Sequence, residues 1–356
     1  MDLYNEICSY ENLELAFTKA RKRKSNQYYV IEFEKELKNN LLQLQTELLI
    51  HSYQPKSLKT FIIRDPKTRK ISKSAFRDRI VHHALYNIIE PLFDKTFIYD
   101  SYANRKGKGA LKAVKRFDYF KKKASKNNSR NCFVLKADIK HYFDNVDHNI
   151  LINLIQKRVK DERVIWLIKK ILKNHKTINN KGMPLGNLTS QFFANIYLDE
   201  IDQFIKHKLK AKHYIRYVDD FVILHNDKIL LEYYKEMINK FLKHNLELEL
   251  HPEKSKILLL KQGTSFLGFR IFYHYKLLIK RNLRKFKNKL KELCQQYYSK
   301  LIEYDSIYDF LEGWFAYSKQ ANTRNFRNKI LKDIEKEFIG EISTKEINRY
   351  QRLITS

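Results

Sequence analysis

The stretch HYIRYVDDFVILH, residues 213–225, constrains the fold more than any other part of the sequence. β-Branched and aromatic residues on both sides of Asp219 and Asp220 predict two strands joined by a tight turn. The usual two-residue hairpin turns need positive φ and favour Gly or Asn, and neither residue is present here. The chain thus places two like charges at a turn that its residues make poorly, which raises the question of what the carboxylates do.

A third carboxylate ends another predicted strand. The apolar strand NCFVLKADI ends near Asp138, and Asp147 is expected to cap the helix that follows. A helix near 228–244 and a strand over LELELHPEKSKILLL complete the region. The order from 132 to 260, β, α, α, β, β, α, β, is that of a split βαβ sheet. In such a sheet the end of the first strand lies beside the turn of the middle hairpin.

Charge limits the possible partners. The net charge of +30 and a pI near 9.7 favour nucleic acid, with an anionic membrane as the second possibility. No apolar run approaches the ~20 residues of a spanning helix, and the acidic start does not read as a secretory signal. We therefore expect no membrane association. Cys8, Cys132 and Cys294 form no CxxC pair, so we expect them to be small buried side chains in a reducing cytoplasm.

The remaining segments predict helices around one further hairpin. Residues 1–50 are expected to be helical, with a basic cluster at 19–25, and 57–72 form two arms around a DPKT turn. His82 and His83 are expected to be ordinary residues of a helix, and 121–131 to be a loop. From about 276 the pattern predicts a basic amphipathic helix. Its expected apolar stripe is Leu283, Phe286, Leu290, Leu293 and Tyr297.

The carboxylates suggest a chemistry. Asp138, Asp219 and Asp220, brought together by the sheet, would repel one another unless cations neutralise them. Mg²⁺ favours a few carboxylates together with substrate phosphate oxygens. Two such ions about 3.5–4 Å apart can stabilise the attacking and leaving oxygens of a phosphoryl displacement. A lone Asp pair could also be an ordinary turn, since Asp suits turns.

Several motifs together resemble those of reverse transcriptases. YVDDF (217–221) resembles their YxDD motif and KADIKHYFDNV (136–146) their first catalytic motif. Further matching segments are FIIRDPKTRKIS, DSYANRKGKGA, GMPLGNLTSQ, HPEKSKI and FLGFRI. The resemblance implies an α+β right-hand polymerase. Its parts would be a basic helical N-terminal extension (1–55), fingers and palm with a split βαβ antiparallel sheet (56–275), and a helical thumb (276–356).

The resemblance also implies residue roles. Two Mg²⁺ ions, which Mn²⁺ could replace, would be held by Asp138, Asp219, Asp220 and the backbone of Ile139. Lys254 would protonate the departing pyrophosphate. The incoming dNTP would contact Arg64, Arg69, Phe143, Leu185, Gly186 and Gln191, with Phe143 selecting deoxynucleotides. The primer and template would contact Tyr217, Val218, Phe266, Leu267 and Gly268. Ordinary structural roles remain as alternatives. They are a core position for Phe143, surface positions for Arg64, Arg69 and Lys254, a turn for Gly186, and packing beneath the loop for Leu185.

The LGNLTSQ form of the Gly-containing loop resembles reverse transcriptases of diversity-generating retroelements. That likeness implies copying of a template-repeat RNA into cDNA with errors opposite adenines, and Leu185 is linked in that family to poor fidelity. It also implies a small basic pentameric accessory protein.

Other readings stay open. A group II intron maturase is expected to continue beyond Ser356, and a retron enzyme to carry its own signatures. A defence-associated reverse transcriptase has a similar core. From another class, a catalytically idle RNA-binding scaffold could use the basic tail and aromatic residues for stacking.

Overall fold

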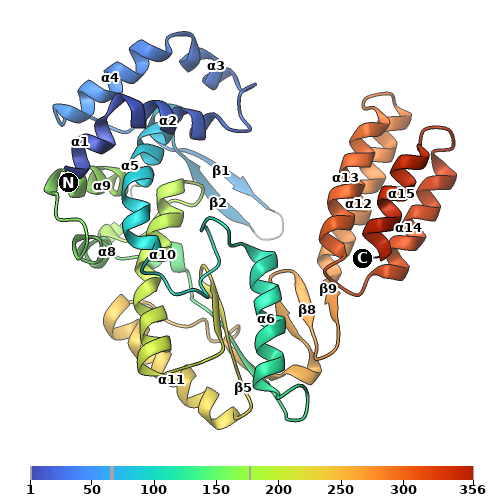
Figure 1. Cartoon of the computed structure of the whole chain (residues 1–356). Helices are drawn as coiled ribbons and strands as arrows, with labels where there is room; N and C mark the ends of the chain where they lie inside the picture. The colour runs from blue at the N-terminus through green and yellow to red at the C-terminus, as the bar shows by residue number, and fades with distance from the viewer. Residues whose placement is uncertain (1, 65–67, 176–177, 356) are drawn as a thin grey trace. The chain divides into compact units, whose positions relative to one another are not determined.

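The computed structural model describes residues 2–64, 68–175 and 178–355, and the chain divides into two compact units (Figure 1). The first unit comprises Met1–Gly109, Leu135–Ile223 and Ile229–Lys256, and the second comprises Ala110–Val134, Leu224–Lys228 and Ile257–Ser356. The boundaries expected from the sequence, at 55 and 275, remain a prediction.

The first unit contains most of the helices that precede the tail. They are α1 Leu3–Cys8, α2 Tyr10–Arg21, α3 Tyr28–Lys35, α4 Leu37–Leu49, α5 Phe76–Asp94, α7 Tyr142–Asn145, α8 His148–Gln156, α9 Glu162–Lys173, α10 Leu188–Gln203 and α11 Lys228–Leu246, with the short turns η1 Ile178–Asn180 and η2 Phe204–Lys208. The strands are β1 Lys59–Ile63, β2 Arg69–Lys73, β3 Phe133–Asp138, β4 Tyr214–Tyr217, β5 Asp220–His225 and β6 Lys256–Leu259, of which β3, β5 and β6 continue into the second unit.

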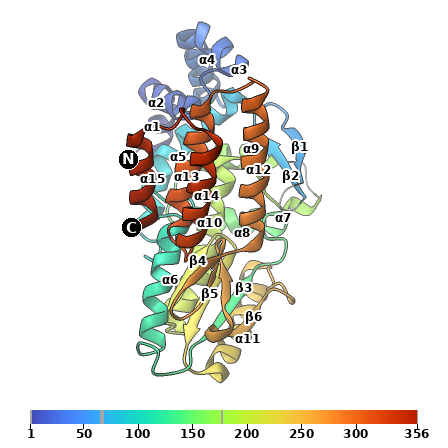
Figure 2. The ribbon, with the colours of Figure 1, turned by 90° about the vertical axis from the view of Figure 1, so that its right-hand side faces the viewer.

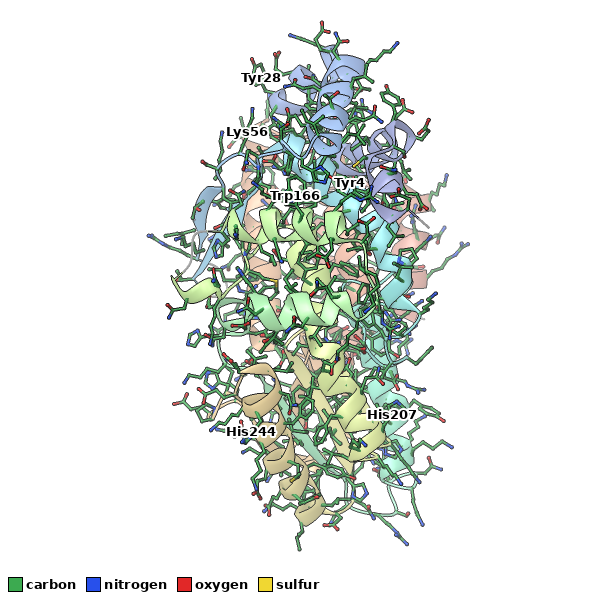
Figure 3. All side chains as sticks on the ribbon, turned by 90° about the vertical axis from the view of Figure 1, so that its left-hand side faces the viewer. Tyr4, Tyr28, Lys56, Trp166, His207 and His244 are labelled. Atoms are coloured by element: carbon green, nitrogen blue, oxygen red, sulfur yellow. The ribbon has the colours of Figure 1, made fainter. Side chains whose placement is uncertain are left out.

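The N-terminal helices are confirmed, and they are tied to the rest of the first unit by Tyr4 on α1. The Tyr4 hydroxyl donates a hydrogen bond to the carbonyl of Leu48 at 2.6 Å. Its ring lies edge-on to Trp166 of α9, with ring centroids 6.5 Å apart, and both side chains are labelled in Figure 3. Because Tyr4 contacts both α4 and α9, it fixes the start of the chain on the first unit.

The central sheet has the strand order β4-β5-β3-β6. Strands β4 and β5 pair antiparallel, with Ile215 opposite Val222, and the side chains of β4 and β5 are largely buried. Strand β3 lies next to β5, so the end of β3 at Asp138 lies beside the β4–β5 turn. The predicted α+β class and the antiparallel central hairpin are therefore confirmed.

The helices between β3 and β4 differ from the prediction, because sequence analysis expected two of them. Helix α8 begins where expected, with the Asp147 carboxylate accepting from the N–H groups of Asn149 and Ile150. Helix α9 was missed, although ERVIWLIKKILK is amphipathic and Asp161 caps it. The aliphatic side chains of α9 are buried, whereas Lys169 and Lys173 are exposed and Lys170 is half-buried, which is the pattern of a surface helix.

Two predicted segments are wrong in extent. Residues 121–124, expected to be part of a loop, form the last turn of α6 (Ala110–Ala124), where the buried Lys121 ammonium pairs with Asp118 and donates to the carbonyl of Phe272. In LELELHPEKSKILLL only β6 is a strand, and Leu250 makes an isolated bridge with Ile139. Pro252 lies between the two parts and has no N–H to offer a sheet.

The second unit combines a small sheet with helices. It contains α6 Ala110–Ala124, η3 Leu260–Gln262, β7 Thr264–Phe266, β8 Phe269–Ile271, β9 Lys276–Leu278, α12 Lys280–Tyr298, α13 Tyr304–Ser318, α14 Arg324–Glu337 and α15 Thr344–Thr355. The last four of these helices lie beside one another in Figure 2.

The amphipathic helix expected from 276 begins at Lys280 as α12, because β9 occupies residues 276–278. In the predicted apolar stripe Phe286 and Leu293 are buried, and the ring of Phe286 stacks on Trp314 with centroids 3.8 Å apart. The stripe therefore holds α12 on α13. No helix among the described residues has the length and apolar character needed to cross a membrane.

Candidate active site

The β4–β5 turn consists of Val218 and Asp219, because Tyr217 pairs with Asp220. Asp220 is thus the first residue of β5. The prediction that both aspartates lie in the turn is therefore wrong for Asp220. Val218 has φ 56°, a left-handed conformation that a β-branched residue rarely adopts. Such strain costs of order 1–3 kcal/mol and persists where the surroundings hold it. The turn without Gly is therefore a strained turn.

Backbone hydrogen bonds bring Asp138 to this turn. The N–H of Ile139 donates to the backbone carbonyl of Asp219 at 3.3 Å. The carbonyl of Asp138 accepts from the N–H of His251 at 2.7 Å, and its N–H donates to the Ser255 hydroxyl at 3.3 Å. The end of β3 is thereby fixed between the turn and the segment that precedes β6.

Like charges meet at the site. Burial, together with the negative charges of Asp138 and Asp220, raises the pKa of the Asp219 carboxyl to about 6, while Lys254 opposes the rise. The Lys254 ammonium lies 3.2 and 3.3 Å from the two oxygens of Asp138. The Lys254 ammonium therefore partly neutralises the negative charge of the carboxylates.

The donor atoms suit a hard divalent cation. Carboxylates accept only, and burial together with the neighbouring carboxylates raises the pKa of Asp219. In residues 2–64, 68–175 and 178–355 no set of three or more Asp, Glu, His or Cys side chains is already arranged as a metal site. Asp138 instead pairs with Lys254. The chemistry of the donors fits a hard divalent cation.

The Gly-containing loop lies against the β1–β2 hairpin. The N–H of Ser72 donates to the carbonyl of Leu185 at 2.9 Å, and the Asn187 amide donates to the carbonyl of Ser72 at 3.0 Å. Gly186 has φ 112°, and a Cβ there would lie 2.8 Å from Cγ2 of Ile71. Only Gly fits this position without a shift of Ile71, so the loop and hairpin form one surface.

The other residues assigned to the nucleotide are placed as follows. Phe143 is half-buried beside Tyr142, with ring centroids 5.2 Å apart, and its carbonyl accepts from the N–H of Met183 at 2.7 Å. Phe143 is thereby linked through the backbone to the segment that leads into the Gly-containing loop. Arg64 and Arg69 are exposed at the end of the β1–β2 hairpin, whose turn residues 65–67 lie outside the described part of the chain.

Gln191 and Leu185 differ in exposure. Gln191 is exposed in the first turns of α10, whereas the Leu185 side chain is half-buried. Tyr217 and Val218, assigned to the primer and template, are half-buried at the strained turn. Tyr217 and Val218 belong to the same unit as the aspartates, whereas the other residues assigned to the primer and template, 266–268, belong to the second unit.

Phe266, Leu267 and Gly268 belong to the second unit, where they form the β7–β8 hairpin. Phe266 is buried against the ring of Phe117, with centroids 5.7 Å apart, so its side chain supports the hairpin from within. Leu267 and Gly268 form the turn and are half-buried. A contact with a primer through this hairpin would therefore use the turn and not the Phe266 ring.

Sequence analysis missed a buried polar network behind the strained turn. Arg216 on β4 is fully buried and forms a two-pronged ion pair with Asp202 of α10, at 2.7 and 2.6 Å. Asn195 and Tyr214 also belong to it. The signal was an Arg within the otherwise apolar YIRY strand, since a charged residue at a buried strand position requires a partner.

Comparison with relatives agrees with this geometry. The chain is 28% identical over 268 residues to protein YkfC of Escherichia coli K12, covering 64% of this chain and 70% of YkfC. It is 27% identical over 296 residues to the group II intron-encoded protein LtrA of Lactococcus lactis subsp. cremoris, covering 62% of this chain. The chain spans 47% of LtrA, so the relative is about twice as long as the matched part.

A solved structure shows the same fold. Apo telomerase from Candida tropicalis superposes with a TM-score of 0.54 at 13% identity, covering 85% of this chain and 62% of that chain. The predicted right-hand polymerase fold is confirmed. The profile of the reverse transcriptase (RNA-dependent DNA polymerase) family matches residues 59–271, which include the three aspartates and the β1–β2, β4–β5 and β7–β8 hairpins. Because this match covers more than half of the chain, the chain belongs to the reverse transcriptase family.

Proposed function

We propose that this chain extends a DNA primer on an RNA template at Asp138, Asp219 and Asp220. The observation that carries the proposal is the 3.3 Å hydrogen bond between the Ile139 N–H and the Asp219 carbonyl. It joins two segments that are far apart in the sequence and places their carboxylates at one end of the sheet. Family membership supports the same reaction.

Asp138, Asp219, Asp220 and the Ile139 carbonyl would hold two Mg²⁺ ions, or Mn²⁺ in their place. Bound there, the ions would stabilise the attacking and leaving oxygens of the displacement. Lys254, whose ammonium is within 3.3 Å of Asp138, would give a proton to the departing pyrophosphate.

The nucleotide would be positioned by the hairpin and the Gly-containing loop. Arg64 and Arg69 are exposed guanidinium groups, which suit bidentate contacts with a triphosphate. Gly186, which lacks a side chain, and Gln191 would face the base and sugar. Phe143 would exclude a ribose 2′-OH, while Leu185 would contact the templating pair. Tyr217, Val218, Leu267 and Gly268 would position the primer and template.

Primer extension on an RNA template tests this assignment. Asp219→Asn removes a charge from the site, and we expect at least an approximately 100-fold lower rate, the scale of losing a preorganised electrostatic group. Asp309→Asn makes the same chemical change at an exposed position of α13 and should keep the wild-type rate. Undiminished synthesis by folded Asp219→Asn would rule out the assignment.

We infer further that the chain works in the cytoplasm as the reverse transcriptase of a diversity-generating retroelement. It would copy a template-repeat RNA with errors at adenines, together with a small basic pentameric accessory protein. The LGNLTSQ loop supports this, and so does the half-buried Leu185, which lies where the loop meets the β1–β2 hairpin. The similarity to LtrA favours the alternative of an enzyme derived from a group II intron.

Sequencing the cDNA separates the two. A template containing all four bases should give errors concentrated opposite adenine, and Leu185→Gln should reduce them. Asn187 is a poor control because it joins the loop to Ser72, so Leu188→Gln, at the next half-buried position, serves instead. Errors spread evenly over the four bases would favour the intron-derived alternative.

A further inference from the structure

The strained metal-site turn is held from behind by a charged side chain that contacts no substrate position. Nη1 of Arg216 donates to the carbonyl of Val218 at 3.2 Å and to the Asn195 side-chain oxygen at 3.3 Å. Val218 is the residue with φ 56°, and its carbonyl directly precedes the amide of Asp219. Arg216 therefore binds the part of the turn that sets the direction of the Asp219 backbone.

The guanidinium itself has almost no freedom. Asp202 accepts from Nε at 2.7 Å and from Nη2 at 2.6 Å, and both side chains are fully buried. The Tyr214 hydroxyl donates to the same carboxylate at 2.6 Å. Arg216 and Asp202 thus form a planar, fork-shaped pair in which the remaining guanidinium nitrogen is directed at the turn.

Helix α10 provides the fixed side of this arrangement. Asn195 and Asp202 are two helical turns apart and so lie on one face of α10. The Asn195 amide also donates to the carbonyl of Ala103 at 2.8 Å. Two buried polar residues of one rigid helix therefore determine where the guanidinium of Arg216 lies.

The backbone of Arg216 is fixed as well. Its N–H donates to the carbonyl of Asp100 and its carbonyl accepts from the N–H of Tyr102, each at 3.0 Å. These bonds make a parallel bridge between Ser101 and Arg216 at the free side of β4. The strand cannot slide or rotate without breaking them, so side chain and backbone hold the turn together.

We propose that Arg216 is a positioning residue, which keeps Val218 in its left-handed conformation so that Asp219 and Asp220 are directed for metal binding. The proposal rests on the proposed function, because it assigns Arg216 to the same reaction. An apolar buried pair could fill the space, but it could not donate to the Val218 carbonyl. The hydrogen bond from Arg216 to the Val218 carbonyl thus explains why a fully buried Arg–Asp pair lies next to the turn.

Arg216→Lys tests the proposal because a lysine keeps the charge but cannot satisfy Asp202, Asn195 and Val218 together. We expect Mn²⁺ binding without substrate, followed by electron paramagnetic resonance, to weaken about 10- to 100-fold, the usual effect of losing a group that orients a metal ligand. The kcat should fall by a similar factor while the KM for dNTP changes little. Mn²⁺ binding that is lost with Asp219→Asn but unchanged in folded Arg216→Lys would overturn this proposal and leave the proposed function standing.

Arg77→Lys is the matched control. Arg77 of α5 is also mostly buried, but its contacts are an ion pair with Glu47 and the ring of Tyr53. This variant should bind Mn²⁺ as the wild type does, even where it lowers the melting temperature. Equal loss of Mn²⁺ binding in both lysine variants would mean that stability alone is involved, and would contradict the proposal.

A second variant addresses folding. Arg216→Met with Asp202→Leu replaces the buried ion pair by apolar side chains, an exchange that often preserves stability. We expect it to fold with a lowered melting temperature, because the buried Tyr214 hydroxyl loses its acceptor, while its Mn²⁺ affinity and kcat fall as in Arg216→Lys. Wild-type Mn²⁺ affinity in this double variant would overturn the proposal. If neither variant folds, the pair determines the fold and the positioning role is rejected.

Discussion

The β4–β5 and β7–β8 hairpins both turn through two residues and both place a non-glycine residue in the left-handed region. Val218 has φ 56° in the first, and Leu267 has φ 45° in the second. The second turn continues with Gly268 at φ 91°, whereas the first continues with Asp219. The second position of the β7–β8 turn is thus the Gly that such turns favour, whereas the same position of the β4–β5 turn is the carboxylate-bearing Asp219.

The supports of the two turns differ accordingly. Behind Gly268 there is no room for a side chain, because a Cβ would lie 2.8 Å from the Tyr317 hydroxyl and 3.0 Å from the Asn282 amide. Behind Val218 lies the guanidinium of Arg216. Close packing and Gly thus suffice to form the β7–β8 turn, whereas the β4–β5 turn, which carries carboxylates, is held by directed hydrogen bonds.

Of the changes that separate the two turns, Val218→Gly should give the largest effect. Relief of the left-handed strain, about 1–2 kcal/mol, and the added freedom of Gly in the unfolded chain nearly cancel, so stability should change by less than about 1 kcal/mol. The turn nevertheless becomes free to adopt other conformations. We therefore expect kcat in primer extension to fall about 10- to 100-fold, as small misplacements of reacting groups do. A variant as active as the wild type would show that strain at Val218 has no role.

Gly268→Ala should act in the opposite way, on stability. The new Cβ meets the Tyr317 hydroxyl at a position with φ 91°, and we expect a loss of about 1–3 kcal/mol in unfolding free energy. Thermal and urea unfolding measure it. Gly313→Ala in α13 is the control, since its Cβ would meet nothing within 4 Å. Gly313→Ala should stabilise the helix slightly, by about 0.5–1 kcal/mol. Equal stability of the two variants would contradict the difference between the sites.

The smallest effect concerns pH and should be confined to the unit with the strained turn. Burial and the neighbouring charge of Asp202 raise the pKa of the Asp199 carboxyl from 3.8 to about 7. Between these values the folded chain keeps a proton that the unfolded chain has lost, so this contribution to stability is complete below about pH 4 and disappears as pH rises through 7. We expect urea unfolding of Asp199→Asn to show a shallower loss of stability between pH 5 and 7.5 than the wild type. Identical pH profiles would exclude Asp199 as the source.

The sequence predicted the parts of the site that depend on local order. Asp138 follows an apolar strand, Asp219 and Asp220 interrupt another, and Asp147 precedes a helix, and each of these patterns is complete within about ten residues. The strand order that joins them follows from the split βαβ pattern. The fold class and the meeting of β3 with the β4–β5 turn could therefore be predicted from the sequence alone.

What could not be predicted depends on side-chain pairing across long distances. Arg216 alone indicates a buried partner, but Asp199, Glu200 and Asp202 on α10 are equally possible from the sequence, and only packing selects Asp202. The exact register of the turn was also missed, because the pairing of Tyr217 with Asp220 depends on the whole ladder. Position in space, not residue type, was the missing information.

The ion pair between Lys254 and Asp138 has a further consequence, for the energetics of metal loading. On the proposed function, a divalent ion would bind carboxylate oxygens that already lie 3.3 and 3.2 Å from the ammonium, so the two cations would repel each other and compete for Asp138. The metal affinity would then include the free energy of weakening this ion pair. The same competition would loosen the hold of Asp138 on Lys254, the group proposed to act on pyrophosphate.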